Sequence, residues 1–411
     1  MQQVYLVLFS LYWAQGLPVG FMTHALPVIL RTQGVSLAHI GGFGLLMLPW
    51  SIKILWAPWV DRVGSEHWGH YKSWILITQL LSVLGLVVLA QIPIEALNQP
   101  LYLWCFFVTL LFINSSGATQ DIATDGLAVK VLLGEQQRWG NTFQVIGSRL
   151  GFIVGGGALL WALDILQWQN TFYILAALVL LNSLPIWHFK EPVQPQKHVS
   201  EPKTTWLEQI KSYFQYFRSN TELKAWLWVL LSFKLADGLS GPLLKPLMVD
   251  LGLSLSQIGI YVTMFGAVAA LIGAALAGFL LRYMQRAQAL LIFSGLKIVS
   301  LAAYAWLAWQ YQQQHMVEAM VIYVINALED AVSAMLLVVM LTLVMQYSRK
   351  TFAGTDFTFQ VAIMATVGGG LYTISGMLGD YLGYAHYLMI IVCMSVLLLW
   401  PIVLWARVRK R

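Results

Sequence analysis

Long apolar runs, separated by short polar stretches, follow one another along almost the whole chain. A helix that crosses a hydrocarbon core of roughly 30 Å needs about 20 consecutive apolar residues. Runs of about this length, bounded by charged residues or by Gly and Pro, therefore predict the membrane-spanning helices of an all-α integral membrane protein. The pattern predicts twelve, near residues 4–29, 39–60, 73–92, 101–126, 141–163, 169–188, 225–248, 256–281, 288–311, 317–346, 355–379 and 385–406.

The composition supports the same fold class. Of the 411 residues, 59% are hydrophobic and only 10% are charged, and the mean hydropathy is +0.70. A soluble domain carries about a quarter charged residues, so this chain has too little polar surface for a large soluble catalytic domain. The sequence contains no HExxH, GxSxG or Walker A motif, and we therefore expect neither an enzyme nor an ATPase.

The two cysteines, Cys105 and Cys393, both lie within apolar runs. Their placement excludes a disulfide framework and a thiolate metal cluster. We expect no metal site and no cofactor.

Basic residues gather in alternate connections between the predicted helices. If the N-terminus is cytoplasmic, most of the 24 Lys and Arg lie in the inner connections and the C-terminal segment, whereas the outer connections carry only Arg31 and Lys245. The positive-inside rule then predicts that both termini are cytoplasmic. The net charge of +6 thus reflects the topology of a membrane protein and does not indicate a nucleic-acid partner.

One connection, 189–224, is long, polar and rich in proline, and it divides the chain into two predicted six-helix bundles, 1–188 and 225–411. We interpret it as a cytoplasmic linker. Its second part has apolar residues at helical spacing, which predicts an amphipathic helix on the inner membrane face. These residues are Trp206, Leu207, Ile210, Tyr213, Phe214 and Phe217.

The two predicted halves resemble each other in sequence. Three matches occur in the same order at nearly the same shift, which indicates an internal repeat. Two parallel six-helix halves are the architecture of secondary transporters of the major facilitator type, in which substrate binds between the halves near mid-membrane. The matches are LVLFSLYWAQGL (6–17) with WVLLSFKLADGL (228–239), SLAHIG (36–41) with SLSQIG (254–259), and TFQV at 142–145 and 358–361, each TFQV being followed by a triple glycine.

Small residues at helical spacing mark the predicted fifth helix. Gly147, Gly151 and Gly155 follow one another at intervals of four and therefore lie on one face. Such a stripe predicts a close approach by a neighbouring helix.

Four charged side chains fall within the predicted spans of the first half: Lys53, Asp121, Asp125 and Arg149. A charge near the bilayer centre costs roughly 2.5–3.5 kcal/mol on insertion scales, so such groups face one another or a wet cavity. Asp121 and Asp125 are four residues apart and share a helix face. We expect these four residues to form one cluster, which is either a structural ion-pair latch or a proton site or substrate-anion clamp.

The second half carries Lys234, Asp237, Lys297, Glu329 and Asp330 within predicted spans. Neighbours on a helix diverge by about 100°, so we expect one of the adjacent carboxylates to face the cavity and the other a neighbouring helix, with Lys297 as a candidate partner. Two alternatives remain for Lys234, Asp237 and the two carboxylates. They form either a substrate site at mid-membrane depth or self-neutralising pairs that hold helix seven to helix ten.

Uncharged polar residues inside the spans are weaker candidates, because hydrogen bonding between helices is their commoner role. Tyr12 is an aromatic candidate for the lining of the cavity. His24, towards the outer end of the first span, is either a satisfied interfacial histidine or a proton relay. The glutamines that can hydrogen-bond a polar ligand are Gln15, Gln120, Gln144 and Gln360.

Two passages resemble a known family. The first is LPWSIKILWAPWVDR at 48–62, and the second runs from ATQDIATDG at 118–126 to QRWGNTFQVIGSRLG at 137–151. Together they resemble the AmpG-like muropeptide permeases of the major facilitator superfamily, with siderophore permeases and the eukaryotic acetyl-CoA transporter as relatives. The resemblance implies that Asp61 and Arg62 form a gating loop. It places these residues on motif positions of the group: Lys53, Asp61, Arg62, Gln120, Asp121, Asp125, Arg138 and Arg149.

The length of the chain favours the siderophore branch, since muropeptide permeases generally carry two further helices or a longer C-terminal part. The resemblance then implies a secondary transporter of the bacterial inner membrane, a monomeric importer of a siderophore or ferric siderophore that is coupled to protons and works by alternating access. Its partners are the small-molecule substrate, protons and the lipid bilayer. A muropeptide permease is the alternative, and a drug-efflux pump is the third possibility.

Overall fold

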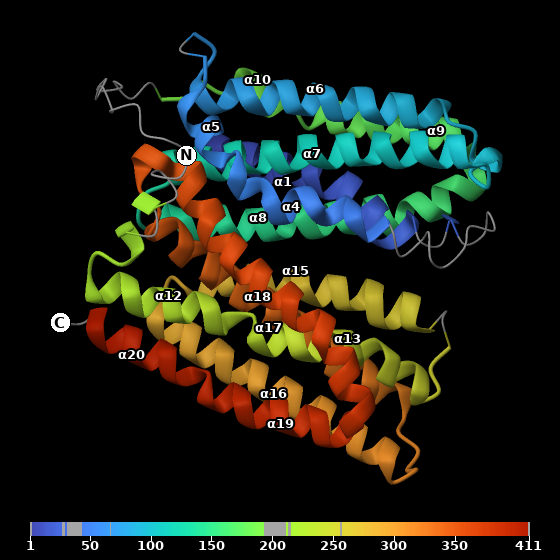
Figure 1. Cartoon of the computed structure of the whole chain (residues 1–411), viewed down its shortest axis with the longest axis vertical. Coiled ribbons are helices and arrows are strands. Elements are labelled where there is room, and N and C mark those ends of the chain that lie inside the picture. The colour runs from blue at the N-terminus through green and yellow to red at the C-terminus, as the bar shows by residue number, and fades with distance from the viewer. Residues whose placement is uncertain are drawn as a thin grey trace. The chain divides into compact units, whose positions relative to one another are not determined.

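The computed structural model describes residues 2–26, 29–30, 43–65, 67–192, 211–212, 215–254 and 257–409. Apart from an isolated bridge between Ser65 and Gly69, the regular structure in these ranges is helical (Figure 1). The chain divides into two compact units. The first unit is Met1–Val193 with Val344–Phe359, and the second is Gln194–Leu343 with Gln360–Arg411.

Nine helical segments within the described ranges are long and apolar enough to cross a membrane. They are Gln3–Thr23, His70–Gln91, Pro100–Val131, Ile165–His188, Thr221–Asp250, Ile258–Leu280, Arg286–Gln312, Ala319–Gln346 and Tyr384–Arg409. Each of the nine coincides with a predicted span.

The other three predicted spans are not among the nine. The one near 39–60 is only partly described, and its described part is split into short helices around Lys53. The one near 141–163 falls on a helix of 17 residues followed by a π-helical turn. The one near 355–379 falls on Ala353–Leu382. The count of twelve therefore stays a prediction.

In the first unit, α6 packs against both α7 and α9, and α1 packs along α8 (Figure 1). Phe21 of η1, Phe106 of α7 and Phe172 of α9 are fully buried in one shared core. The elements are α1 (Gln2–Gly20), η1 (Phe21–Ala25), η2 (Phe43–Met47), α4 (Leu48–Ile52), η3 (Lys53–Leu55), α5 (Ala57–Arg62), α6 (His70–Gln91), η4 (Ile94–Ala96), α7 (Pro100–Val131), α8 (Gln136–Phe152), η5 (Ile153–Ala158), α9 (Leu159–Leu181), α10 (Leu184–His188) and η7 (Lys350–Phe352).

In the second unit, α16 packs against α19 and α12 against α20. Two of the long spans are interrupted: Lys234 separates α12 from α13, and Leu398 separates α19 from α20. The elements are α12 (Thr221–Phe233), α13 (Leu235–Asp250), η6 (Ile258–Met264), α15 (Phe265–Leu280), α16 (Arg286–Gln312), α17 (Ala319–Gln346), α18 (Ala353–Leu382), α19 (Tyr384–Leu397) and α20 (Leu399–Arg409); the last residues of α17 and the first turns of α18 cluster with the first unit.

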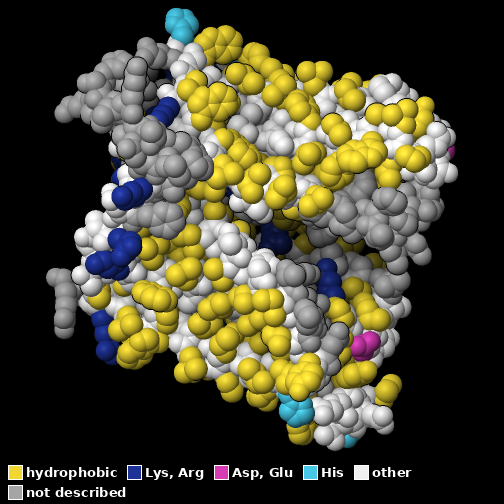
Figure 2. Space-filling model, in the orientation of Figure 1, with side chains coloured by type: hydrophobic (Ala, Val, Ile, Leu, Met, Phe, Trp, Pro, Cys, Tyr) yellow, Lys and Arg dark blue, Asp and Glu magenta, His cyan; other side chains and the backbone are white. Residues whose placement is uncertain are grey.

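Large apolar side chains cover much of the molecular surface (Figure 2). Leu84, Trp104, Ile272 and Val299 are each more than half exposed, although they lie near or within the helices long enough to span a membrane. A water-soluble protein rarely exposes apolar patches of this extent. The surface is therefore that of a protein whose helices contact lipid.

Some predictions fall outside the described residues. Most of the amphipathic helix predicted in the linker lies in 193–210 and 213–214, the SLAHIG match lies in 31–42, and the side chain of His24 is not among those described. These three expectations therefore remain predictions.

The predicted glycine stripe of α8 does meet a neighbouring helix. A Cβ atom at Gly151 would lie 2.5 Å from the Cα of Gly16, and one at Gly147 would lie 2.7 Å from the carbonyl oxygen of Phe9. Atoms that are not bonded cannot approach so closely, so any larger residue at these positions pushes α1 and α8 apart. The glycines hold α1 against the helix that carries Gln144 and Arg149.

We predict opposite effects for the same substitution at two glycines. Gly151→Ala inserts a methyl group between two backbones and should destabilise the protein by about 1–3 kcal/mol. Gly295→Ala in α16 meets no neighbouring atom within 4 Å and should be neutral or stabilising by about 0.5–1 kcal/mol, since alanine favours a helix over glycine. Thermal unfolding in detergent measures both effects. Equal Tm values for the two variants would contradict the close packing.

Candidate functional site

A buried ion pair lies in the first unit. The ammonium of Lys53 in η3 contacts the carboxylate of Asp121 in α7, and the two side chains are only 4% and 12% exposed. The ring of Trp50 lies 5.3 Å from the lysine nitrogen. Removal of one partner would leave a bare charge in an apolar environment, which costs about 3–5 kcal/mol.

Asp125 lies one turn further along α7 and is only 2% exposed. Its carboxylate accepts a hydrogen bond of 2.5 Å from the hydroxyl of Tyr12 in α1 and one of 3.4 Å from the side-chain amide of Gln144 in α8. It also interacts electrostatically with Asp121 and Lys53. Three helices thus converge on this carboxylate.

This cluster carries unequal charge. Lys53, Asp121 and Asp125 bring one positive and two negative charges into a buried environment, and no further cation among the described residues lies within ion-pair distance of either carboxylate. A buried charge that is not compensated tends to be neutralised by a shift in protonation. The arrangement is therefore chemically suited to hold one proton, which the two carboxylates can share.

Arg149 does not join the cluster, contrary to our expectation. Gln144 is the side chain of α8 that reaches Asp125, and Arg149 lies five residues later, about 140° around the helix. Its half-buried guanidinium lies 6.0 Å from the ring of Phe152, and in the described part of the chain no carboxylate is within ion-pair distance. A cation of this kind is available for an anionic ligand.

The glutamines of the first unit differ in their bonding. The amide of Gln15 donates to the hydroxyl of Thr124 (3.2 Å), which is a bond between helices. Gln120 is 2% exposed, and its amide nitrogen has no hydrogen-bond partner within the described ranges; neither has the side-chain oxygen of Gln144. A buried polar atom left without a partner is uncommon and points to a bound water or ligand.

A balanced network occupies the middle of the second unit. Asp237 in α13 pairs with Lys234 (2.7 Å) and with Lys297 of α16 (2.9 Å), and Lys297 also contacts Glu329 of α17. The ammonium of Lys297 donates its remaining hydrogen bond to the hydroxyl of Ser333 (2.6 Å). The two positive charges equal the two negative ones, so this network needs no proton for neutrality.

The adjacent carboxylates of α17 diverge as expected, but each lies beside a neighbouring helix, and neither lines the cavity described below. Glu329 takes Lys297 as its partner, whereas Asp330 accepts a hydrogen bond from the amide of Asn326 (2.9 Å) and lies beside Gly266 of α15. Gln360, which is fully buried, accepts a hydrogen bond from the indole of Trp226 (2.7 Å). That bond links α12 to α18. Hydrogen bonding between helices was the commoner of the two roles considered for this glutamine.

Asp61 of the predicted gating loop binds the beginning of α18. Its carboxylate accepts hydrogen bonds from the backbone N–H groups of Gly354 (3.0 Å) and Thr355 (2.7 Å) and from the hydroxyl of Tyr71 (2.5 Å). A helix N-terminus favours a negative charge. Burial nevertheless raises the pKa of the Asp61 carboxyl above its usual range, while these hydrogen bonds act to lower it. Arg62 is exposed.

The sequence alone did not predict two sets of contacts near Asp61. Arg349 forms a bidentate pair with Asp356 (2.7 and 2.8 Å). Glu191 accepts hydrogen bonds from the backbone N–H groups of Tyr71 and Lys72 at the start of α6 (3.0 Å each). Asp356 lies inside the predicted span 355–379. The cost of placing a charge within the membrane therefore applies to it as well. Glu191 lies in the linker, where the sequence offers no signal for its partner.

The fold matches those of solved transporters. The structure superposes on the fucose:proton symporter FucP of E. coli with a TM-score of 0.69 and 16% identity, covering 99% of this chain and 98% of that one. It superposes on the proton:xylose symporter XylE with a TM-score of 0.69 and 13% identity, covering 97% and 94%. At these identities the likeness concerns the fold. The chain therefore has the fold of the major facilitator superfamily.

Sequence relatives narrow the class further. The family model of acetyl-coenzyme A transporter 1 matches residues 3–174. The anhydromuropeptide permease of Escherichia coli K12 is 28% identical over 363 residues, 87% of this chain and 71% of that protein. The putative transporter AmpG 4 of Rickettsia conorii is 23% identical over 394 residues, covering 94% and 93%. The predicted resemblance to AmpG-like permeases is thus confirmed, whereas the length argument for the siderophore branch finds no support among these relatives.

The contact between Lys234 and Asp237 can be tested as a pair. Each alanine variant alone leaves one unbalanced charge in the network of Lys234, Asp237, Lys297 and Glu329, and should lose transport activity. If the pair is structural, Lys234→Ala with Asp237→Ala should recover activity, because the double variant restores neutrality around Lys297 and Glu329. Initial uptake rates of the four proteins measure the coupling. Additive losses in the double variant would instead indicate that both side chains act on the substrate.

Proposed function

We propose that this protein imports a muropeptide-class solute, an amino sugar joined to a short peptide, across the bacterial inner membrane by alternating access, driven by protons. The observation that carries the proposal is the similarity to the anhydromuropeptide permease of E. coli, which extends over 87% of this chain. The distribution of basic residues supports cytoplasmic termini. The same relatives favour this solute over the siderophore considered from the sequence.

The cluster of Lys53, Asp121 and Asp125 supports coupling to protons. Its surplus negative charge is relieved when one proton binds, and the proton is released when the carboxylates gain a cation or water. A site of this kind has different proton affinities in two conformations of the protein, which is the physical requirement for coupling. The hydroxyl of Tyr12, at 2.5 Å from Asp125, orients this carboxylate.

Arg149 supports recognition of an anionic solute. A muropeptide carries free carboxylates on its peptide, and a guanidinium binds a carboxylate through two parallel hydrogen bonds. Arg149 lacks a carboxylate partner in the described part of the chain, so a substrate carboxylate would not have to displace an internal one. The amide of Gln120 is the candidate for a polar group of the solute.

Uptake by proteoliposomes tests the substrate and the coupling together. We expect labelled anhydromuropeptide to accumulate when the outside is acidic and accumulation to stop when a protonophore collapses the gradient. Labelled ferric siderophore, added at the same concentration, should not accumulate. Accumulation of the siderophore alone would overturn the proposed substrate, and uptake that is unaffected by the protonophore would overturn the coupling.

Asp125→Asn should separate coupling from binding. The substitution removes the surplus charge and leaves the pair of Lys53 and Asp121 intact, so we expect normal accumulation in the membrane, loss of gradient-driven uptake and retained exchange of labelled for unlabelled solute.

Asp121→Asn is the companion variant, because it breaks the ion pair instead, and we expect lower accumulation of the protein. Asp250→Asn, an exposed aspartate at the end of α13, is the control for the substitution itself. Full gradient dependence in Asp125→Asn would show that this carboxylate does not couple protons.

A further inference from the structure

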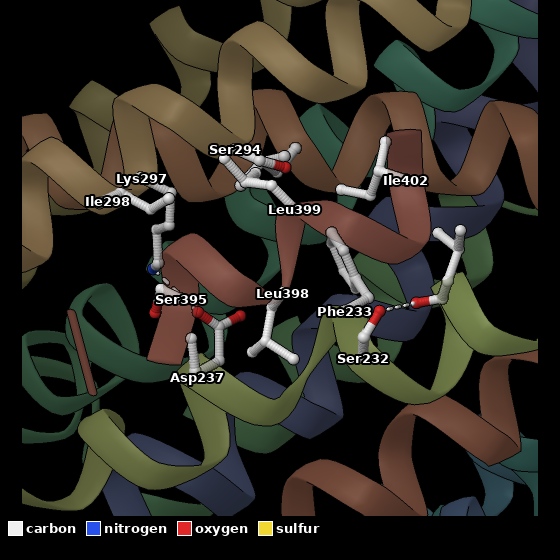
Figure 3. A pocket seen from close by; sticks show the side chains of 13 residues that line it. Ser232, Phe233, Asp237, Ser294, Lys297, Ile298, Ser395, Leu398, Leu399 and Ile402 are labelled. Atoms are coloured by element: carbon white, nitrogen blue, oxygen red, sulfur yellow. Dashed lines mark hydrogen bonds and ion pairs between the residues drawn. The ribbon is translucent and has the colours of Figure 1, made fainter. Parts of the chain in front are cut away.

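A small cavity lies inside the second unit where two helices are interrupted. Lys234 separates α12 from α13, and Leu398 separates α19 from α20. The two breaks, together with α16, border a half-open cavity with a volume of about 50 Å³ (Figure 3). A helix that breaks within hydrocarbon leaves backbone groups without intrahelical partners, which is tolerated where these groups are buried in protein or line a wet cavity.

The polar part of the lining faces the charged network. Asp237 and Lys297 point toward each other at one end of the cavity, next to Ser395 (Figure 3). Ser232 and Ser294 are the other polar residues of the lining, and the rest is apolar. The cavity therefore gives access to the Asp237 carboxylate, whose side chain is 28% exposed.

The hydrogen-bonding groups of the lining indicate what kind of ligand the cavity can hold. The ammonium of Lys297 already contacts Asp237, Glu329 and Ser333. Ser395 donates to the carbonyl of Ile391 (2.7 Å) and Ser232 to that of Val229 (3.1 Å), which leaves their oxygens as acceptors. Together with the carboxylate, these groups suit a ligand that donates hydrogen bonds.

The charge of the lining and the volume of the cavity favour water as the occupant. The network of Lys234, Asp237, Lys297 and Glu329 is neutral, so the cavity attracts neither an anion nor a cation strongly. A cavity needs only about 10–15 Å³ to hold a water molecule and must offer it polar partners. A volume of about 50 Å³, lined by a carboxylate and three serines, meets this condition.

We propose that this cavity is a water site within the hydrocarbon layer, which hydrates Asp237 and allows its contact with Lys297 to open and close during transport. Asp237, Lys297 and Ser395 all lie near the middle of spans long enough to cross the membrane. Without water, separation of the two charges at this depth would leave both of them bare. Water at the break of α12 and α13 supplies substitute partners, so that these helices can move relative to α16.

Thiol reactivity tests for the water. N-ethylmaleimide crosses membranes but reacts with the thiolate, which forms in water and is suppressed in hydrocarbon. We expect Ser395→Cys, in a background that carries Cys105→Ala and Cys393→Ala, to react at least about tenfold faster than the native Cys393 in a chain that carries only Cys105→Ala. Cys393 is the matched control because it lies two residues away on the same helix and is exposed on the outer surface.

A second position keeps the test decisive. If Ser395→Cys does not accumulate, Ser294→Cys on α16 takes its place, since Ser294 lines the cavity from the other side. Reaction at the cavity position no faster than at Cys393 would mean that the cavity is dry or filled by a lipid chain, and would overturn the proposal. The reaction requires no substrate, so its result is independent of the proposed muropeptide.

Filling the cavity tests its role in transport. Ala236→Leu places a bulky side chain in the lining, whereas Ala302→Leu adds the same volume on an exposed position of α16. We expect Ala236→Leu to slow solute exchange by about tenfold or more and to abolish the labelling of Ser395→Cys, and Ala302→Leu to change neither. Lost labelling with unchanged exchange would refute the role of the water in transport.

Discussion

The high free energy of a charge in hydrocarbon is the constraint on which this structure depends. A chain that is 59% hydrophobic can span a membrane many times, but each ionisable group within a span then needs a partner, a proton or water. The two units meet this requirement differently. In the first unit, Lys53 neutralises one of the two carboxylates of its cluster, Asp121 and Asp125, whereas in the second unit the four charges around Lys297 neutralise one another.

This difference in charge balance bears on function. The sequence left both groups of charges open as either a functional site or a structural latch. The contacts distinguish the two groups by their charge balance. A neutral network such as that around Lys297 can hold helices together without any exchange of protons. A cluster with a surplus carboxylate, such as that of Lys53, Asp121 and Asp125, becomes neutral when it binds one proton, which is the basis of the coupling proposed above.

Helix geometry explains which contacts were predictable from the sequence. That Lys297 pairs with one of the two adjacent carboxylates followed from depth and from their divergence, and the structure shows that this carboxylate is Glu329. The glycine stripe of α8 followed from a spacing of four residues. The position of Arg149 did not follow, because residues at one depth on two helices meet only if both helices are rotated toward each other. That rotation depends on packing, here on the glycines that bring α1 to α8.

By itself, the sequence determined the class of protein and the depth of its charges. Apolar runs, basic connections and the internal repeat can be identified in the sequence without knowing which residues are in contact in the folded protein. The tertiary structure alone decided which charges meet. It paired Lys53 with Asp121, left Arg149 without a carboxylate among the described residues, and created a cavity where two broken helices face Lys297. The reason is physical: position along a helix sets depth and face, but contacts between helices are set by how whole surfaces pack.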